Sequence, residues 1–147
     1  MILADANLLL YAVNEDSPHH QGARRWLEKT LSSTTRVGLS WLVVLAFLRI
    51  TTRSGIFQRP LSSDQAMEYV DAWLELPNVA LVGPGRRHWE ILRRLLRAAG
   101  TAGNLTSDAH LAALAIEHGY PIYSTDADFR RFQGVQHVNP LVELGKA

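Results

Sequence analysis

The sequence predicts an α/β sandwich built around a mostly parallel β-sheet. Two observations indicate this fold class. Short apolar segments typical of β-strands alternate with longer segments whose apolar residues recur at helical spacing, and short turns with glycine or proline separate them. Strands that alternate with helices in this way pair in parallel and are covered by the helices. At 147 residues, the chain is expected to fold as a single domain, residues 1–147, with a full hydrophobic core.

Local signals place the individual elements. Pro18 suits the first position of a helix, Ser62 or Ser63 is a suitable N-cap, and Gly100 and Gly119 suit helix C-termini. The predicted elements, in chain order, are a strand at 2–4, a helix at 17–31, a strand at 36–40, helices at 41–52 and 62–76, a strand at 78–84, helices at 86–100 and 107–119, and strands at 121–126 and 135–139.

Composition excludes several classes of protein. The chain has no cysteine, which excludes disulfides and thiolate metal sites and favours a cytoplasmic location. The N-terminal apolar stretch contains Asp5, and the apolar run at 41–48 is too short to span a bilayer, so a membrane protein is not expected. The formal net charge of +1 neither supports nor excludes a nucleic-acid partner.

Acidic residues stand where several predicted elements begin or end. Asp5 ends the first strand, Asp126 ends a later strand with Asp128 two residues beyond it, and Asp108 begins a helix. Ligand sites of parallel sheets lie beyond the carboxyl ends of the strands, so these carboxylates are expected to converge there. Clustered carboxylates repel one another unless a cation neutralises them, and hard oxygen ligands select Mg²⁺ or Mn²⁺. The sequence therefore predicts a divalent metal site.

Each acid also has an ordinary structural explanation. The helix dipole favours Asp108 near a helix N-terminus, and Asp126 and Asp128 are common turn residues. Asp5 fits such explanations less well, because it lies inside an apolar run with neither a turn nor an evident cap. A buried charge without a partner is costly, so Asp5 gives the strongest indication of a metal ion.

The motifs around these acids resemble those of the PIN-domain family, specifically the VapC-type endoribonuclease toxins of bacterial type II toxin–antitoxin modules. The segments that carry the resemblance are DAN at 5–7, LSWLVVLAFLRITT at 39–52, TSDAHLAALAIEHG at 106–119, YSTDADF at 123–129 and NPL at 139–141. The resemblance implies a PIN-like three-layer α/β/α sandwich with a mostly parallel sheet of four or five strands. It also implies a Mg²⁺-dependent RNA phosphodiesterase, usually a homodimer, that is held inactive by a small antitoxin whose C-terminal segment wraps the toxin.

This chemistry gives the polar residues expected roles. Phosphodiester hydrolysis needs an activated water and a stabilised leaving oxygen, which one or two Mg²⁺ ions held by acids can provide. Asp5, Asp108 and Asp126 are the expected catalytic acids. Asp5 and Asp108 are the expected principal metal ligands, and Asp126 is expected to ligate the metal or to position water on it. Asn7 and Thr125 are expected to orient these groups or the substrate.

One departure from the PIN pattern concerns a fourth acid. PIN domains commonly carry a Glu on the second helix, yet no Asp or Glu occurs between Glu28 and Asp64, and the corresponding turn holds residues 44–47. Either Asp128 completes the site as a further metal ligand, or the chain holds metal more weakly than the pattern implies.

The helix at 86–100 has leucines on one face and arginines on the other, which is typical of a solvated amphipathic helix. Contact with an RNA backbone is the functional alternative for Arg86, Arg93 and Arg97. The four tryptophans occupy apolar helical positions and are predicted to pack in the core rather than to stack on bases.

Two other functions are compatible with the fold. A phosphoryl-transfer enzyme of the haloacid-dehalogenase type also begins with a strand that ends in Asp, but it requires the pattern DxD where this chain has Asp5, Ala6 and Asn7. A module that keeps the PIN fold and binds RNA or a partner protein without catalysis is the main alternative, because the usual helix Glu is absent. An RNA cleavage assay with Mg²⁺ or Mn²⁺, and with EDTA, distinguishes the three.

Overall fold

The sheet of this protein has five strands, which pair in the order β3-β2-β1-β4-β5, and all four neighbouring pairs are parallel. The structure is a computed structural model that describes residues 1–142. The strands are β1 (Ile2–Ala4), β2 (Val37–Leu39), β3 (Val79–Leu81), β4 (Ile122–Tyr123) and β5 (His137–Val138). The predicted α/β fold with a parallel sheet is confirmed.

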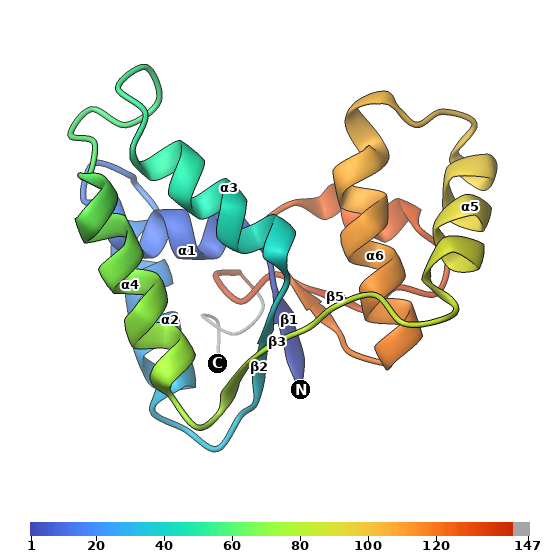
Figure 1. Cartoon of the computed structure of the whole chain (residues 1–147), viewed down its shortest axis with the longest axis horizontal. Coiled ribbons are helices and arrows are strands. Elements are labelled where there is room, and N and C mark those ends of the chain that lie inside the picture. The colour runs from blue at the N-terminus through green and yellow to red at the C-terminus, as the bar shows by residue number, and fades with distance from the viewer. Residues whose placement is uncertain (143–147) are drawn as a thin grey trace.

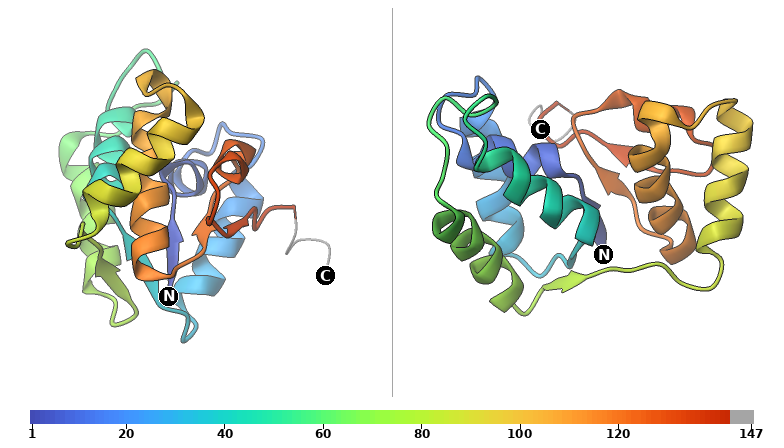
Figure 2. Two further views of the ribbon diagram at one scale, coloured as in Figure 1. Left: turned by 90° about the vertical axis from the view of Figure 1, so that its right-hand side faces the viewer. Right: turned by 45° about the horizontal axis from the view of Figure 1, so that its top comes forward.

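Helices cover both faces of the sheet and make a three-layer sandwich. The helices are α1 (Ala6–Val13), α2 (His20–Leu31), α3 (Trp41–Thr51), α4 (Ser63–Glu75), α5 (His88–Ala99) and α6 (Thr106–His118), with short 3₁₀ helices η1 (Gly103–Leu105) and η2 (Ala127–Arg131). Figure 1 shows α1 to α4 on one side of the sheet and α5 and α6 on the other, and Figure 2 shows the same division from a second direction.

The division between the two faces follows from the strand order. The chain moves from β1 to β2 to β3 in one direction across the sheet, and then returns past β1 to β4 and β5. Parallel strands are joined by right-handed connections, so reversing the direction places the connecting helices on the opposite face. The order reverses between β1 and β4, and this switch point is where open α/β sheets bind ligands.

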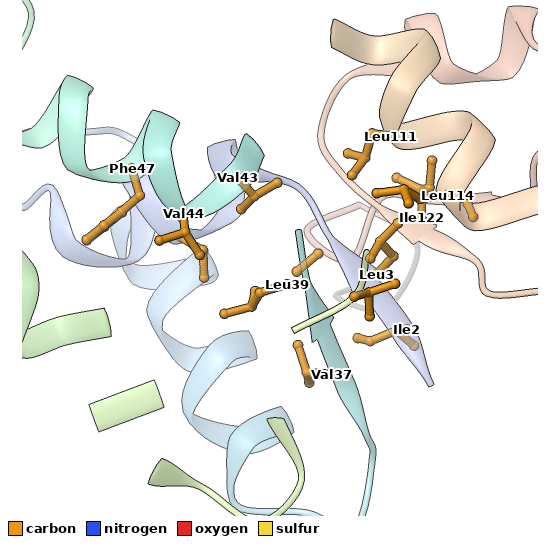
Figure 3. Close-up of a cluster of buried hydrophobic side chains, with 14 of the residues drawn as sticks. Ile2, Leu3, Val37, Leu39, Val43, Val44, Phe47, Leu111, Leu114 and Ile122 are labelled. Carbon is orange, nitrogen blue, oxygen red and sulfur yellow. The ribbon is translucent and has the colours of Figure 1, made fainter. Parts of the chain in front are cut away.

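The core fills the space between the sheet and its helices (Figure 3). Leu3 of β1 and Ile122 of β4 are fully buried and lie beside Leu111 and Leu114 of α6. On the other face, Phe47 of α3 is fully buried and packs edge-on against Trp73, with the ring centroids 4.9 Å apart. Buried apolar side chains contribute about 1.5–3 kcal/mol each, so this packing holds the ends of β1 and β4 in fixed positions.

The largest difference from the predicted elements is α1, which the sequence did not indicate. The apolar run after Asp5 is not a continuation of the first strand, because β1 ends at Ala4 and a helix begins at Ala6. Asp5 is the N-cap of this helix, and its side chain accepts a hydrogen bond from the Ala6 N–H. The expectation that Asp5 is not a cap was therefore wrong.

Most other boundaries agree within a few residues. Ser62 caps α4 in a reciprocal arrangement with Gln65, and Gly100 and Gly119 end α5 and α6 in the left-handed conformation that favours glycine. The helix predicted from residue 17 begins instead at His20, and the strands are shorter than expected. None of the helices within residues 1–142 is long and apolar enough to cross a membrane.

The prediction that all four tryptophans pack in the core was wrong for two of them. Trp73 is buried and Trp26 is half-buried, where it stacks on Tyr123 with the ring centroids 5.9 Å apart. Trp41 is 57% exposed and Trp89 is 68% exposed. Both lie at helix positions next to the apolar face, where spacing alone does not separate a buried side chain from an exposed one.

Candidate active site

Asp5 lies at the switch point between β1 and β4, directly after the last residue of β1. The Asp5 N–H donates a hydrogen bond to the Tyr123 carbonyl at 3.0 Å, so the parallel pairing of the two strands extends to this residue. Burial raises the pKa of Asp5, and the negative charge of Asp126 raises it further, whereas hydrogen bonds from Ser124 and Ala6 and the nearby His137 oppose the rise. The carboxylate is therefore held in a site that disfavours its charge unless a cation is present.

Ser124 connects the residues of this site through hydrogen bonds, and it was not among the site residues predicted from the sequence. Its side chain is fully buried at the end of β4. The Ser124 hydroxyl donates to Asp5 Oδ2 at 2.7 Å, and accepts from the Asn7 side-chain amide at 3.1 Å and from the Asp126 N–H at 3.0 Å. One donated and two accepted bonds use the full capacity of a hydroxyl. The sequence shows only a hydroxyl residue two positions before Asp126, and the role of this hydroxyl depends on the pairing of β4 with β1.

The two residues predicted to orient the site are placed differently from each other. The Asn7 side chain lies beside Asp5 and connects α1 to the segment after β4, because its amide donates to Ser124 and its Oδ1 faces the Thr125 N–H at a long 3.5 Å. Among the described residues, the Thr125 hydroxyl has no hydrogen-bond partner. Asn7 therefore has a structural part in the site, and Thr125 contributes its backbone.

Asp126 and Asp128 lie in the turn that leads from β4 into η2. Asp126 is half-buried and its Oδ1 accepts from the Asp128 N–H at 2.9 Å, so it caps η2 while its carboxylate stays near Asp5. Asp128 is exposed, although its charge is close enough to contribute to the raised pKa of Asp108. Both residues therefore belong to the turn and also lie near the other acids.

Asp108 reaches the same place from the first turn of α6. Partial burial, together with the charges of Asp126, Asp5 and Asp128, raises its pKa from 3.8 to about 6. The structure thus brings the four predicted acids into one electrostatic neighbourhood at the carboxyl edge of the sheet. Burial and the repulsion of the neighbouring carboxylates both disfavour the charged form of Asp108.

The α3 helix supplies no acid to this site. Val44 and Phe47, which lie where PIN domains commonly place a Glu, are buried in the core, and Leu45 between them is exposed. The polar group that α3 brings nearest the carboxyl edge of β2 is its N-cap, Ser40, which is buried and accepts from the Val43 N–H at 3.1 Å. The fourth carboxylate of the neighbourhood is therefore Asp128.

The oxygen donors of this site are of the type that a hard divalent cation prefers. Their positions, however, do not form a metal site in this structure. Carboxylates that raise one another's pKa are a site of high negative charge, and oxygen donors are the ligands that Mg²⁺ and Mn²⁺ prefer. Within residues 1–142, no group of three or more His, Asp or Glu side chains is placed so that it could hold a metal ion.

The arginines predicted to contact RNA lie apart from these acids. Arg93 and Arg97 are exposed on α5, and Arg86 lies in the loop before that helix. None of the three is in an ion pair with a residue of the described chain.

The Ser124 hydroxyl yields a first prediction. In Ser124→Ala, the buried Asp5 carboxylate loses a donor and the Asn7 amide and Asp126 N–H lose an acceptor, so the free energy of unfolding should fall by about 1–3 kcal/mol. Urea denaturation without divalent metal measures this. Thr125→Ala is the matched control and should stay within about 0.5 kcal/mol of the parent. Equal stability of the parent and Ser124→Ala would show that the network is not structural.

The raised pKa of Asp108 yields a second prediction. Because its pKa of about 6 exceeds the ordinary 3.8, the folded protein binds a proton that the unfolded chain has lost, and this stabilisation is present below about pH 4 and lost as the pH rises through about 6. Asp108→Asn does not titrate. Its stability relative to the parent in EDTA should therefore increase between pH 4 and 7.5, by the order of 1 kcal/mol after solvent screening. A difference that is independent of pH would contradict the clustered charges.

Comparison with known proteins identifies the family. The PIN-domain model matches residues 2–135. Ribonuclease VapC37 of Mycobacterium tuberculosis is 50% identical over 140 residues, which are 95% of this chain and 97% of that protein. Ribonuclease VapC33 of the same species is 43% identical over 143 residues, which are 97% of this chain and 100% of that protein.

Solved structures share the fold at lower identity. The VapBC2 complex of Rickettsia felis, bound to a DNA fragment of its promoter, has a TM-score of 0.68 at 17% identity, covering 94% of this chain and 98% of that one. Mycobacterium tuberculosis VapC20, described as a toxin that cleaves the sarcin–ricin loop, has a TM-score of 0.64 at 19% identity, covering 92% and 99%. The chain therefore belongs to the PIN-domain family, and within it to the VapC group.

Proposed function

We propose that this protein is a Mg²⁺- or Mn²⁺-dependent endoribonuclease, the toxin of a toxin–antitoxin pair. The observation that carries the proposal is the convergence of four acids on the switch point, where burial and the charges of the other three acids together raise the pKa of Asp108 to about 6. A cluster of this kind binds a divalent cation to relieve its own repulsion. Relatives that cover almost the whole chain are named ribonucleases, which supports RNA as the substrate.

The positions of the residues suggest a separate role for each of them. Asp5 and Asp108, which come from β1 and α6, would hold the metal, and Asp126 would hold it or position a water. A bound Mg²⁺ supplies positive charge against the phosphate and lowers the pKa of a water that attacks phosphorus. Ser124 keeps Asp5 and the Asp126 backbone in register, and Asn7 fixes Ser124 in turn. These hydrogen bonds would limit the movement of Asp5 and Asp126 around a bound cation.

Partners follow from the solved relatives. The structures of VapBC2 and of FitAB, the latter with a TM-score of 0.69 at 20% identity and coverage of 96% of both chains, are complexes bound to DNA fragments. We propose that this chain likewise pairs with a small antitoxin, forms a homodimer and acts in the cytoplasm.

A second function is favoured by one feature of the site. Since α3 contributes Val44 and Phe47 to the core where an acid is expected, and no metal site is preformed within residues 1–142, the chain could bind RNA or a partner with weak or no catalysis. Cleavage of RNA by the purified protein with Mg²⁺ or Mn²⁺, abolished by EDTA, supports the enzyme. Binding without cleavage under both metals supports the binding module.

The roles of Asp5 and Asp108 yield a third prediction. Asp5→Asn or Asp108→Asn should leave the protein folded. Asn is as good an N-cap as Asp at position 5, and losing the acceptor of the Ser124 hydroxyl there costs only about 1–3 kcal/mol. Asp108 makes no hydrogen bond within the described chain that Asn would break. Losing a ligand charge should slow metal-dependent RNA cleavage roughly 10²-fold or more. Single-turnover cleavage measures the rate. Asp71→Asn, on the exposed face of α4, is the matched control, and parental rates in both site variants would refute the assignment.

The place of Asp128 yields a fourth prediction. Asp128 is exposed, and its charge is the smallest of the causes that raise the pKa of Asp108, so we expect it to act on the metal through a bound water. Asp128→Asn should lose less activity than Asp5→Asn, and the loss should shrink as Mg²⁺ rises, because mass action offsets weaker binding. Identical Mg²⁺ midpoints and plateaus for the parent and Asp128→Asn would show that Asp128 is only a turn residue.

A further inference from the structure

Trp89 is the most exposed large apolar side chain of the described chain, at 68% exposure. It lies in the first turn of α5, next to the face formed by His88, Ile91 and Leu95, which packs toward α6. No ring contact to another side chain involves Trp89 among residues 1–142. The exposed Trp89 indole lies outside the core, so its ring is accessible to a partner outside the fold.

Arginines continue the line of Trp89 along the helix. Arg93 and Arg97 follow it at intervals of four residues, so the three side chains form one row about 12 Å long on the surface of α5. Neither arginine, nor Arg94 beside them, forms an ion pair in the described part of the chain. Glu90 is the one acid within α5, so the row carries a net positive charge.

Two hollows flank this row and lead toward the acids. One, of about 540 Å³, is lined by Trp89, Glu90, Arg93, Arg94, Arg97 and Ala98. The other, of about 350 Å³, shares Arg94 and Ala98 with the first and extends to Arg131 and Phe132. Arg131 is the last residue of η2, and η2 begins directly after Asp126. The basic surface therefore runs from Trp89 along α5 to η2, which contains Asp128 and has Asp126 as its N-cap.

We propose that this surface, defined by Trp89, Arg93, Arg94, Arg97 and Arg131, binds the single-stranded RNA substrate beyond the scissile bond. A base stacks on the Trp89 indole, and the arginines contact the phosphates that follow it toward the acids. Stacking on an aromatic side chain within a basic groove is how proteins bind single-stranded nucleic acids. The proposal rests on the proposed function for the identity of the polymer.

Charge and ring chemistry favour RNA over a protein at this surface. The acids at the switch point repel a polyanion, so a substrate needs cations nearby to approach them, and unpaired arginines supply these. The guanidinium group of arginine can donate two hydrogen bonds to the oxygens of one phosphate, and any base can stack on an exposed indole ring. A duplex cannot use the indole, because its bases are already stacked on one another.

The test is RNA binding by the full chain in EDTA, where cleavage is blocked. The probes are a fluorescein-labelled single-stranded RNA of about 12 nucleotides, a length within the site sizes of such proteins, and the same RNA annealed to its complement. Trp89→Leu should weaken single-strand binding about tenfold, whereas Trp89→Phe, which keeps an aromatic face, should stay within about threefold of the parent. Binding of the duplex should not change in either variant.

The arginines are tested by salt dependence. Arg93→Gln with Arg97→Gln should lower the slope of log affinity against log salt by about 1.4, since each phosphate contact to a single strand contributes about 0.7. Arg25→Gln with Arg36→Gln is the matched control, because it removes the same charge from exposed positions on α2 and before β2, and its slope should equal that of the parent.

Several outcomes would overturn the proposal. If Trp89→Leu binds single-stranded RNA as tightly as the parent, the proposed stacking contact is refuted. Equal salt slopes for the two arginine double variants would refute the proposed phosphate contacts. A change in the sedimentation mass of Trp89→Leu with unchanged RNA affinity assigns the surface to a second copy of the chain. A parent that binds RNA in EDTA but does not cleave it with Mg²⁺ refutes the proposed function alone, because the Trp89 and arginine comparisons still decide this surface.

Discussion

The hydrogen bond from Ser124 to Asp5 is the interaction on which the site depends. It joins residues 119 positions apart in the chain, at the point where β1 and β4 become neighbours in the sheet. The same hydroxyl fixes the Asp126 backbone and the Asn7 side chain, so one buried group sets the position of the first strand end, the first turn of α1 and the turn into η2. Packing of Leu3 and Ile122 on α6 holds the strands that carry it.

The clustered carboxylates destabilise the folded protein at the edge of the sheet where the reaction is expected to occur. Burial and repulsion raise the pKa of Asp5 and Asp108, and only part of that cost is offset by hydrogen bonds from Ser124 and Ala6. A protein without a ligand at this edge would gain stability by replacing one of the acids. Under the proposed function, a cation that binds among these carboxylates would offset the cost of keeping them together.

The alternation of strands and helices was enough to predict the parallel sheet and the edge to which its acids belong, because both follow from connection rules. The cap role of Asp5 was not predictable, since α1 is apolar on most sides and has no distinct helical period. The role of Ser124 depends on a pairing between distant strands, which no local pattern encodes. The exposure of Trp89 depends on where α6 covers α5, which the spacing of leucines leaves undetermined.

The most direct test of the coupled acids is an NMR titration of the aspartate carboxyl carbons, with and without Mg²⁺. Asp108 should titrate near pH 6 in the absence of Mg²⁺, and its pKa should fall well below that value at saturating Mg²⁺, because a bound cation favours the ionised carboxylate. An Asp108 that titrates near its ordinary 3.8 without metal, or near pH 6 in both conditions, would contradict a metal site built from these four acids.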